Sequence, residues 1–337
     1  MAVGVKDVAA AASVSVGTVS NVLNRPETVA PATVARVQAA IERLGFVRND
    51  AARQLRAGRS RSLGLIVLDS ANPFFAEVAR GAEERARERG LSVLLGNSDH
   101  DGERENAYLD LFREQRVNGI LLTPHGLDPD RARMLAELAD AGLPVVLLDA
   151  ELEGGRLPSV AVDDVEGGQL AVAHLLAQGR RRIAFVGGPP SVRQVADRLE
   201  GARRALAAAP DAALEVIECD ELTVLRGRDV GEAIARRAVD ERPDAVFCAN
   251  DLLAVGVLQG AGILGSVRIP DDLALVGYDD IDFAQATVVP LSSVRQPARE
   301  IGAAAVDVLF SVLDDPASEP RHVRFRPELV VRASSGG

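Results

Sequence analysis

Five polar residues each stand at the end of a short apolar run, where a sheet protein places its binding groups. They are Asp69, Asn97, Asp149, Asn250 and Asp279. Carboxylate oxygens accept hydrogen bonds, and amides both donate and accept them, so such a set suits a polar ligand, whereas chance could place one or two polar residues at strand ends. In open α/β sheets the carboxyl ends of the strands line the ligand crevice. The pattern therefore predicts a site for a small polar ligand.

A second set of residues recurs at helical spacing near the N-terminus: Gly17, Ser20, Asn21 and Asn24. These residues form a helix face that is polar, uncharged and narrow. A helix that faces water usually carries charged side chains there, whereas small hydroxyl and amide groups suit close approach to phosphates and base edges. This face predicts contact with a nucleic acid, and a small helical cap without a ligand is the alternative.

No arrangement typical of catalysis or of metal binding occurs in the sequence. The four histidines lack metal-ligand spacing, and the two cysteines are too few for a disulfide scaffold. Cys248 lies in the apolar run "DAVFCAN", which predicts a buried thiol. The segment "GAGILG" fits G-x-G-x-x-G, but a helical pattern precedes it, so it predicts a glycine-rich helix end rather than a dinucleotide loop. We expect no enzyme activity, cofactor or metal.

Three short helices must position the N-terminal set. Apolar residues recur at helical spacing from Val5 to Ala12, and Ser15 can cap a second helix because its hydroxyl can accept from an N–H two or three residues later. The third helix is expected from Pro31, a favoured first-turn residue, to Gly45 as its C-terminal cap. Two short helices joined by a tight turn describe a helix-turn-helix.

Strands that alternate with amphipathic helices must position the first set. The apolar runs predict strands at 63–69, 91–97, 119–124, 144–149, 160–164, 182–188, 214–220, 244–250 and 273–280. Continuous apolar strands separated by helices are typical of parallel sheets covered on both faces. The expected fold is an all-α headpiece followed by an α/β core of two doubly wound parallel-sheet subdomains.

The net charge changes sign near residue 62, where the predicted headpiece gives way to the predicted core. Residues 1–62 carry a net charge of +5, and the remaining 275 residues carry −16. A basic head on an acidic body suggests a polyanionic partner for the head alone, and a solvated basic surface is the alternative. The sequence has no apolar run long enough to span a membrane and no signal peptide at its start, so a soluble cytoplasmic protein is expected.

Two segments carry a specific resemblance, "VKDVAAAASVSVGTVSNVLN" and "AIERLGFVRNDAARQLRAGRS". They resemble the headpiece and hinge of the lactose-repressor (LacI/GalR) family, and the resemblance continues over essentially the whole chain. It implies a core like that of periplasmic binding proteins. The implied domains are a headpiece (1–47), a hinge (48–61) and a core (62–337), with an N-subdomain at about 62–160 and 292–318 and a C-subdomain at about 161–291 and 319–337.

The resemblance implies DNA-contacting residues in the headpiece and hinge. They are Ser15, Val16, Gly17, Thr18, Ser20, Asn21, Asn24 and Thr33, with Ala52 and Leu55 in the hinge helix. Val16, Gly17 and Asn21 would face bases, and Leu55 would wedge into the minor groove. The residues that would touch the phosphate backbone are Thr18, Ser20, Asn24 and Thr33. Because Val16 offers only apolar contact and Gly17 only space, Asn21 is the main candidate for direct readout. Leu55 packed against the core is the alternative.

The resemblance also implies an effector site between the subdomains. Its residues are Phe74, Phe75, Asp149, Arg198, Asn250, Asp279 and Gln296. Arginine, asparagine and carboxylate groups can bridge neighbouring hydroxyls, and a phenyl face suits the C–H surface of a sugar ring. A carbohydrate effector is therefore favoured, with Phe75 as a core residue the alternative for that position.

The sequence predicts a repressor that binds pseudo-palindromic DNA as a homodimer and responds to a small polar effector. A solute-binding protein of a transport system is the alternative from another class, but it predicts a signal peptide and no basic head. A regulator that responds to a nucleobase or to a protein co-regulator also remains open.

Overall fold

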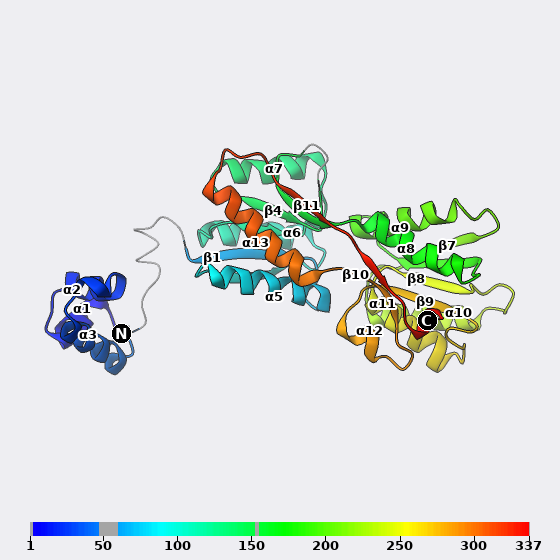
Figure 1. The fold of residues 1–337 in the computed structure, drawn as a ribbon, viewed down its shortest axis with the longest axis horizontal. Coiled ribbons are helices and arrows are strands. Elements are labelled where there is room, and N and C mark those ends of the chain that lie inside the picture. The colour runs from blue at the N-terminus through cyan, green and yellow to red at the C-terminus, as the bar shows by residue number, and fades with distance from the viewer. Residues whose placement is uncertain (1–2, 47–59, 152–154, 337) are drawn as a thin grey trace. The chain divides into compact units, whose positions relative to one another are not determined.

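The computed structural model describes residues 3–46, 60–151 and 155–336. The chain divides into two compact units, Met1–Ser60 and Arg61–Gly337, drawn in Figure 1. Each unit has hydrophobic clusters of its own.

The first unit is a bundle of short helices: α1 (Val5–Ala12), α2 (Val16–Asn24), the 3₁₀ turn η1 (Pro26–Thr28) and α3 (Pro31–Leu44). Ser13 ends α1 in the left-handed conformation, at φ 53°. The Ser15 hydroxyl then accepts from the Thr18 N–H at 3.0 Å and caps α2. Gly45 ends α3 at φ 60°. The three predicted helices and their caps are confirmed.

The core of this bundle consists of small and β-branched side chains. Val19 and Val22 of α2 are buried in one cluster with Val8 of α1 and Val37 of α3. Because these valines face inward, helix periodicity turns Gly17 and Asn21 of α2 outward, where both are exposed.

The second unit contains two six-stranded sheets. The first has the order β11-β5-β4-β3-β1-β2 and consists of β1 (Ser62–Val67), β2 (Ser92–Asn97), β3 (Ile120–Leu122), β4 (Val145–Leu148), β5 (Ser159–Val162) and β11 (His322–Phe325). The second has the order β12-β10-β9-β8-β6-β7 and consists of β6 (Arg182–Gly187), β7 (Ala213–Glu218), β8 (Ala245–Cys248), β9 (Ala274–Asp279), β10 (Ser292–Arg295) and β12 (Glu328–Val330). All neighbouring strands are parallel except β10 and β12. The predicted fold class is confirmed.

The two sheets repeat one plan, so we call each sheet with its helices a lobe. Read from the same end, β4 of the first lobe corresponds to β9 of the second, and β1 corresponds to β6. In chain order, β1 is the first strand of the first lobe and β6 is the first strand of the second. The helix α5 (Pro73–Glu88) follows β1, and α9 (Arg193–Leu206) follows β6. Equivalent positions in the two lobes can therefore be compared directly.

Helices cover both faces of the first sheet, and strand alternation determines which side chains they meet. Leu65 of β1 and Val146 of β4 point toward α5 and α13 (Ala298–Asp314). Ile66 and Leu147, one residue further along the same strands, point toward α6 (Gly102–Glu114) and α7 (Pro129–Asp140). Because successive side chains alternate between faces, a sheet covered on both sides needs an unbroken apolar run.

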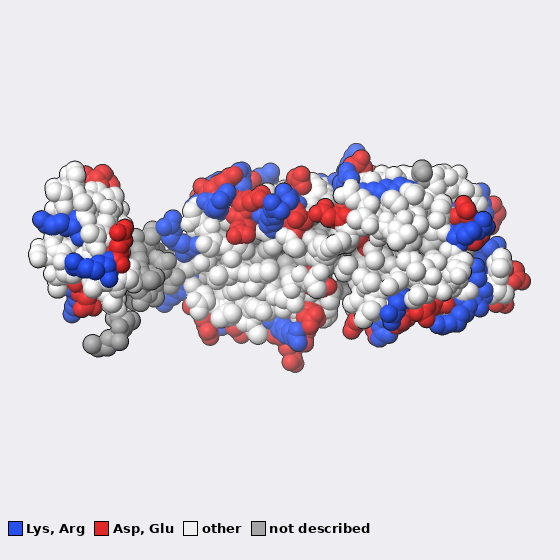
Figure 2. Space-filling model, turned by 90° about the horizontal axis from the view of Figure 1, so that it is seen from below, with Lys and Arg blue, Asp and Glu red and all other residues white. Residues whose placement is uncertain are grey.

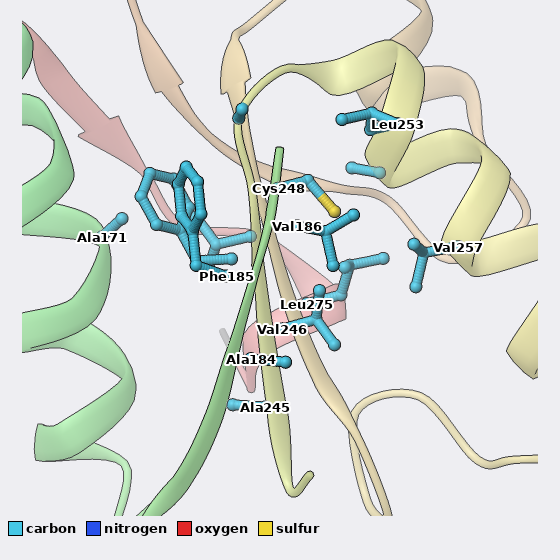
Figure 3. Close-up of a cluster of buried hydrophobic side chains, with 14 of the residues drawn as sticks. Ala171, Ala184, Phe185, Val186, Ala245, Val246, Cys248, Leu253, Val257 and Leu275 are labelled. Carbon is cyan, nitrogen blue, oxygen red and sulfur yellow. The ribbon is translucent and has the colours of Figure 1, made fainter. Parts of the chain in front are cut away.

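The second sheet is built in the same way. Its helices are α8 (Asp164–Ala177), α9, α10 (Val224–Arg236), α11 (Asp251–Val257), the π-helix η2 (Leu258–Leu264), α12 (Asp282–Ala286) and the 3₁₀ turn η3 (Ala333–Ser335). Figure 3 shows Phe185 of β6 on the side of Ala171 in α8, and its neighbour Val186 on the side of Leu253 in α11. Cys248 lies in the same cluster and is fully buried, as its sequence setting predicted.

The glycine-rich segment "GAGILG" lies at the end of the α11–η2 helix, as predicted. A Cβ atom on Gly260 would come within 2.2 Å of the Arg228 carbonyl oxygen in α10. The glycine therefore allows two helix backbones to approach closely, which explains the motif without a nucleotide.

The chain passes between the lobes three times: after β5, after β10, and between β11 and β12. Figure 1 shows the last passage as the red segment that runs from one lobe to the other. The sequence-based division placed residues 292–318 in the N-subdomain and residues 319–337 in the C-subdomain. In the structure, residues 292–295 belong to the second sheet and residues 322–325 to the first, so the last two passages lie later in the chain. These short strands, "SSVR" and "HVRF", are too polar to form a recognisable apolar run.

Candidate functional site

The outward face of α2 carries the residues that were predicted to face bases. Val16 is 43% exposed although it is apolar. Gly17 and Asn21 are exposed as well, and a Cβ atom on Gly17 would meet nothing closer than the Ser15 hydroxyl at 3.6 Å. Packing does not require a glycine at this position, so the small residue keeps the helix surface narrow rather than filling a tight space.

The residues predicted to contact phosphates lie beside this face and are partly engaged by their own helix. The Ser15 and Thr18 hydroxyls lie 2.9 Å apart, and Asn24 Nδ2 donates to the Ser20 carbonyl oxygen at 2.8 Å. Thr33 is half-buried in the first turn of α3, where backbone N–H groups favour a phosphate. Ala52 and Leu55 lie outside the described residues, so the hinge-helix prediction stays a prediction.

The second unit carries a net negative charge, in contrast to the net positive charge of residues 1–62. On the face shown in Figure 2, its acidic and basic side chains lie side by side. Many form ion pairs, such as Arg85 with Asp307 at 2.7 Å.

A small cavity separates the carboxyl ends of the strands of the two lobes, with a volume of about 40 Å³. Six of the seven predicted effector residues line it: Phe74, Phe75, Asp149, Arg198, Asn250 and Asp279. The seventh, Gln296, is buried behind Asp279 and donates to its carboxylate at 2.8 Å. Asn97, which also ends a strand, is not in this lining and instead accepts from the Ser70 N–H at 3.0 Å.

Arg198 is the buried cation at the centre of the cleft. Its Nε donates to Asp164 at 2.8 Å, and its Nη1 donates to the Ala249 carbonyl oxygen at 2.7 Å. The guanidinium lies over the Tyr278 ring at 3.7 Å from the ring centroid. Burial alone would lower the pKa of Arg198, but Asp164, Tyr278 and Asp279 outweigh it and raise the pKa. The guanidinium therefore stays charged and held in one orientation.

Two aspartates face each other across the cleft from equivalent places in the lobes. Asp149 follows β4, Asp279 ends β9, and both have positive φ, 52° and 103°. Non-glycine residues in such strained backbone cluster at ligand sites. Burial and then the Asp164 charge raise the pKa of Asp149 to about 7. Burial also raises the pKa of Asp279 to about 6, although Arg198 opposes it.

The hydrogen-bond inventory of the cleft has an unfilled acceptor. Within the described residues, Asp149 Oδ1 is buried and has no hydrogen-bond partner. Asn250 is more committed, since its Oδ1 accepts from the Leu253 N–H at 2.9 Å and its Nδ2 donates to the Leu222 carbonyl oxygen at 3.2 Å. A buried carboxylate oxygen without a donor is costly, and a ligand hydroxyl or amine would satisfy it.

The two phenylalanines form an apolar wall of the cavity. Their ring centroids are 5.1 Å apart in an edge-to-face arrangement. Both rings are buried, and both also belong to the core of the first lobe. Phe75 therefore combines the two roles that the sequence left open, core residue and cavity lining.

Sequence reasoning missed several polar groups that lie at the cleft. Asn72, Gln194 and His100 line the cavity, and Asp164 holds Arg198. Burial lowers the pKa of the His100 imidazole. Asn72 could have been found as the helix cap in "NPFF", in the short connection that follows β1. The other three carry no local signal, because their role depends on contacts between elements distant in sequence.

The part of the chain that the structure describes shows neither a group of metal ligands nor a membrane span. It contains no group of three or more His, Cys, Asp or Glu side chains arranged to hold a metal ion. None of its helices is both long enough and apolar enough to cross a membrane.

Comparison with known proteins matches both units. Residues 4–49 match the model of the bacterial regulatory proteins of the lacI family, and residues 172–335 match the periplasmic binding protein-like domain. Among curated relatives, the HTH-type transcriptional repressor PurR of Photobacterium profundum is 32% identical over 98% of each chain. The ribose operon repressor of Escherichia coli is 34% identical and covers 98% of this chain and 99% of its own.

A solved structure agrees over both units. The lac repressor dimer bound to operator and the anti-inducer ONPF has a TM-score of 0.86 at 27% identity, and the match covers 99% of each chain. The headpiece, the two-lobed core and the full-length similarity to named repressors agree, and the chain belongs to the LacI family of DNA-binding transcriptional regulators.

Proposed function

We propose that this regulator is a repressor that binds a two-fold symmetric operator as a homodimer and changes its DNA affinity when a neutral sugar binds in the cleft. The observation that carries the effector class is the buried Asp149 oxygen without a partner, beside Arg198 and Asp279. The protein acts by binding, without catalysis, and works in the cytoplasm, where operator DNA is accessible.

In this proposal the exposed face of α2 enters the major groove. Asn21 donates to and accepts from a base edge, Val16 meets a thymine methyl group, and Gly17 lets the backbone approach. Thr18, Ser20, Asn24 and Thr33 contact phosphates and set the orientation of the helix, and Ser15 at the helix cap lies beside them. Ala52 and Leu55 contact the minor groove, which Leu55 opens by insertion between base pairs.

A dimer is supported by the exposed edge of the first sheet. The edge strand β2 exposes Leu94 and Leu95 to 37% and 52%, and the neighbouring helix α6 exposes Leu111 to 42%. An edge strand with exposed leucines on both faces is a liability for a monomer, and a second copy would cover it. The lac repressor is a dimer on its operator, which agrees with this arrangement.

Charge in the cleft favours a neutral effector over an anionic one. Three buried carboxylates, those of Asp149, Asp164 and Asp279, surround the single guanidinium of Arg198, which is already bonded to Asp164. A phosphate or carboxylate ligand would add to this excess of negative charge, whereas sugar hydroxyls donate to the carboxylates. The ribose operon repressor among the relatives supports a sugar, and a nucleobase is the alternative effector.

The test begins with selection of genomic fragments by the full-length protein, which yields the operator. DNA affinity is then measured by fluorescence anisotropy at fixed salt with D-ribose, cellobiose, D-ribose 5-phosphate and adenine. We expect a neutral sugar to change the affinity and the phosphorylated sugar to be inactive. Asp279→Asn should abolish the sugar response, and Leu55→Ala should weaken operator binding. A response to the phosphorylated sugar or to adenine alone would overturn the effector class.

A further inference from the structure

Two side-chain amides bridge the cleft in a reciprocal pattern. Asn72, at the start of the first helix of the first lobe, reaches Asp279 of the second lobe. Gln194, in the first turn of the equivalent helix of the second lobe, reaches Asp149 of the first. Since β4 corresponds to β9 and α5 to α9, the two bridges join corresponding elements and run in opposite directions, although Asn72 is the cap of its helix and Gln194 lies within the first turn of the other.

Asn72 uses both ends of its side chain. Its Oδ1 accepts from the Phe74 N–H at 3.0 Å and caps α5, while its Nδ2 donates to Asp279 Oδ2 at 3.2 Å. Asp279 Oδ1 accepts from Gln296 at 2.8 Å, so amides hold both carboxylate oxygens. Of the two amides, Asn72 is the one that lines the cavity, so it lies on the side from which an effector hydroxyl would approach Asp279.

Gln194 bridges the lobes by donating to a backbone carbonyl group rather than to a carboxylate. Its Nε2 donates to the Asp149 carbonyl oxygen at 2.9 Å, and the residue is 6% exposed. This bond leaves Asp149 Oδ1 without a partner. Gln194 therefore links the two lobes, while the Asp149 Oδ1 atom keeps its capacity to accept from a ligand.

The space that remains between the lobes is too small for a sugar. The volume of about 40 Å³ is room for a few water molecules, which together have fewer heavy atoms than a sugar ring. Apolar contact adds to the closure, because Ile281, two residues after Asp279, is buried in the cluster that contains Phe74 and Phe75. Entry of a sugar requires the lobes to separate, and the amide bridges resist that separation.

We propose that Asn72 and Gln194 form an intramolecular latch that holds the two lobes together in the sugar-free protein and so opposes entry of the effector. This inference rests on the proposed function, because it assigns the regulation of the same cleft. The latch sets effector affinity without adding any contact to the effector. Only the unlatched fraction of the protein can bind, so the apparent Kd equals the intrinsic Kd divided by that fraction.

Single substitutions can remove the amide donor of Asn72 or of Gln194 and keep the helix capping or packing that the same side chain provides. Asn72→Ser keeps an oxygen that caps α5 but is too short to reach Asp279. Gln194→Met keeps the length and the packing volume but has no donor. Asp128→Ser is the matched control, because Asp128 caps α7 by accepting from the Arg131 N–H at 2.8 Å and is not among the residues that line the cavity.

Two measurements on the full-length protein test the latch. The first is lobe separation in sugar-free solution, from spin labels at Glu137→Cys in α7 and Ala173→Cys in α8, with one labelled copy per dimer. Both positions are exposed, and the native cysteines are buried and escape labelling. The second is the Kd of D-ribose and of cellobiose by calorimetry.

We expect Asn72→Ser and Gln194→Met each to lengthen the distance between labels and to tighten sugar binding about 2-fold to 10-fold, the range for loss of one hydrogen bond. Asp128→Ser should change neither. Unchanged distances, or weaker sugar binding by Asn72→Ser, would overturn the latch. If neither sugar binds any variant, the proposed effector class fails, while the label distances still decide whether the latch exists.

Discussion

The α2 surface and the interlobe cleft are built in opposite ways. On α2 the side chains proposed to face bases are exposed, uncharged and carried by one helix. In the cleft the corresponding groups are buried, charged and supplied by both lobes. A single helix can present the first set before any partner binds, whereas the second set exists only when two sheets meet. Substitutions should therefore separate binding from folding on α2 and combine the two in the cleft.

The largest expected effect comes from removing the cation of the cleft. Arg198→Met leaves Asp149, Asp164 and Asp279 buried without a counter-charge, and breaking such an arrangement costs about 3–5 kcal/mol of the free energy of unfolding. Urea denaturation followed by circular dichroism measures the loss. Arg226→Met is the control, because its ion pair with Asp220 is 45% exposed on the arginine side and contributes less than about 1 kcal/mol. If both variants lost the same free energy of unfolding, Arg198 would not be the cation that stabilises the buried carboxylates of the cleft.

A pH-dependent effect should follow from the carboxylate opposite. The pKa of Asp149 is about 7 in the folded chain, well above the ordinary value of 3.8, so the folded state binds this proton more tightly than the unfolded state does. Above pH 7 the ionised Asp149 carboxylate lowers the free energy of unfolding. This destabilisation disappears as the pH falls from 7 toward 4 and the carboxylate takes up its proton. Asp149→Asn should therefore raise the melting temperature more at pH 8.5 than at pH 5, by the equivalent of a few kcal/mol.

The same stabilisation at both pH values would contradict the raised pKa. Asp128→Asn is a suitable comparison, since Asp128 is an exposed helix cap and should show no such gain at high pH.

The smallest of the three effects concerns α2 and should leave the fold untouched. Asn21→Ala removes an exposed amide and should reduce the affinity for operator DNA by about 1–3 kcal/mol, with unchanged unfolding in urea. Affinity for scrambled DNA should fall much less, because phosphate contacts remain. Gln38→Ala, also exposed but on α3, is the matched control. Equal affinity of Asn21→Ala and Gln38→Ala for operator would exclude Asn21 from base readout.

The headpiece could be predicted from sequence in detail because its determinants are local. Val19 and Val22 point to the core through helical spacing alone, and Ser15 and Gly45 mark helix ends through backbone chemistry with near neighbours. The apolar strands were equally visible. Strands β10, β11 and β12 were missed because they are short and polar, and their pairing partners decide that they are strands.

The cleft was predictable only in part. Asp149 and Asp279 end strands and could be placed at the crevice. Asn97 ends a strand too, yet it supports a neighbouring turn through the Ser70 N–H. Sequence position alone does not separate these cases, because β2 lies at the edge of its sheet and β4 lies inside it.

By itself the sequence determined the headpiece, the fold class, the charge division and the family, since periodicity, caps and motifs act over a few residues. Only the tertiary structure decided which carboxylates share Arg198, how far burial raises their pKa values, and that Asn72 and Gln194 reach across the cleft. Desolvation and long-range hydrogen bonds depend on what the rest of the chain places around a group, and no local pattern of residues encodes that.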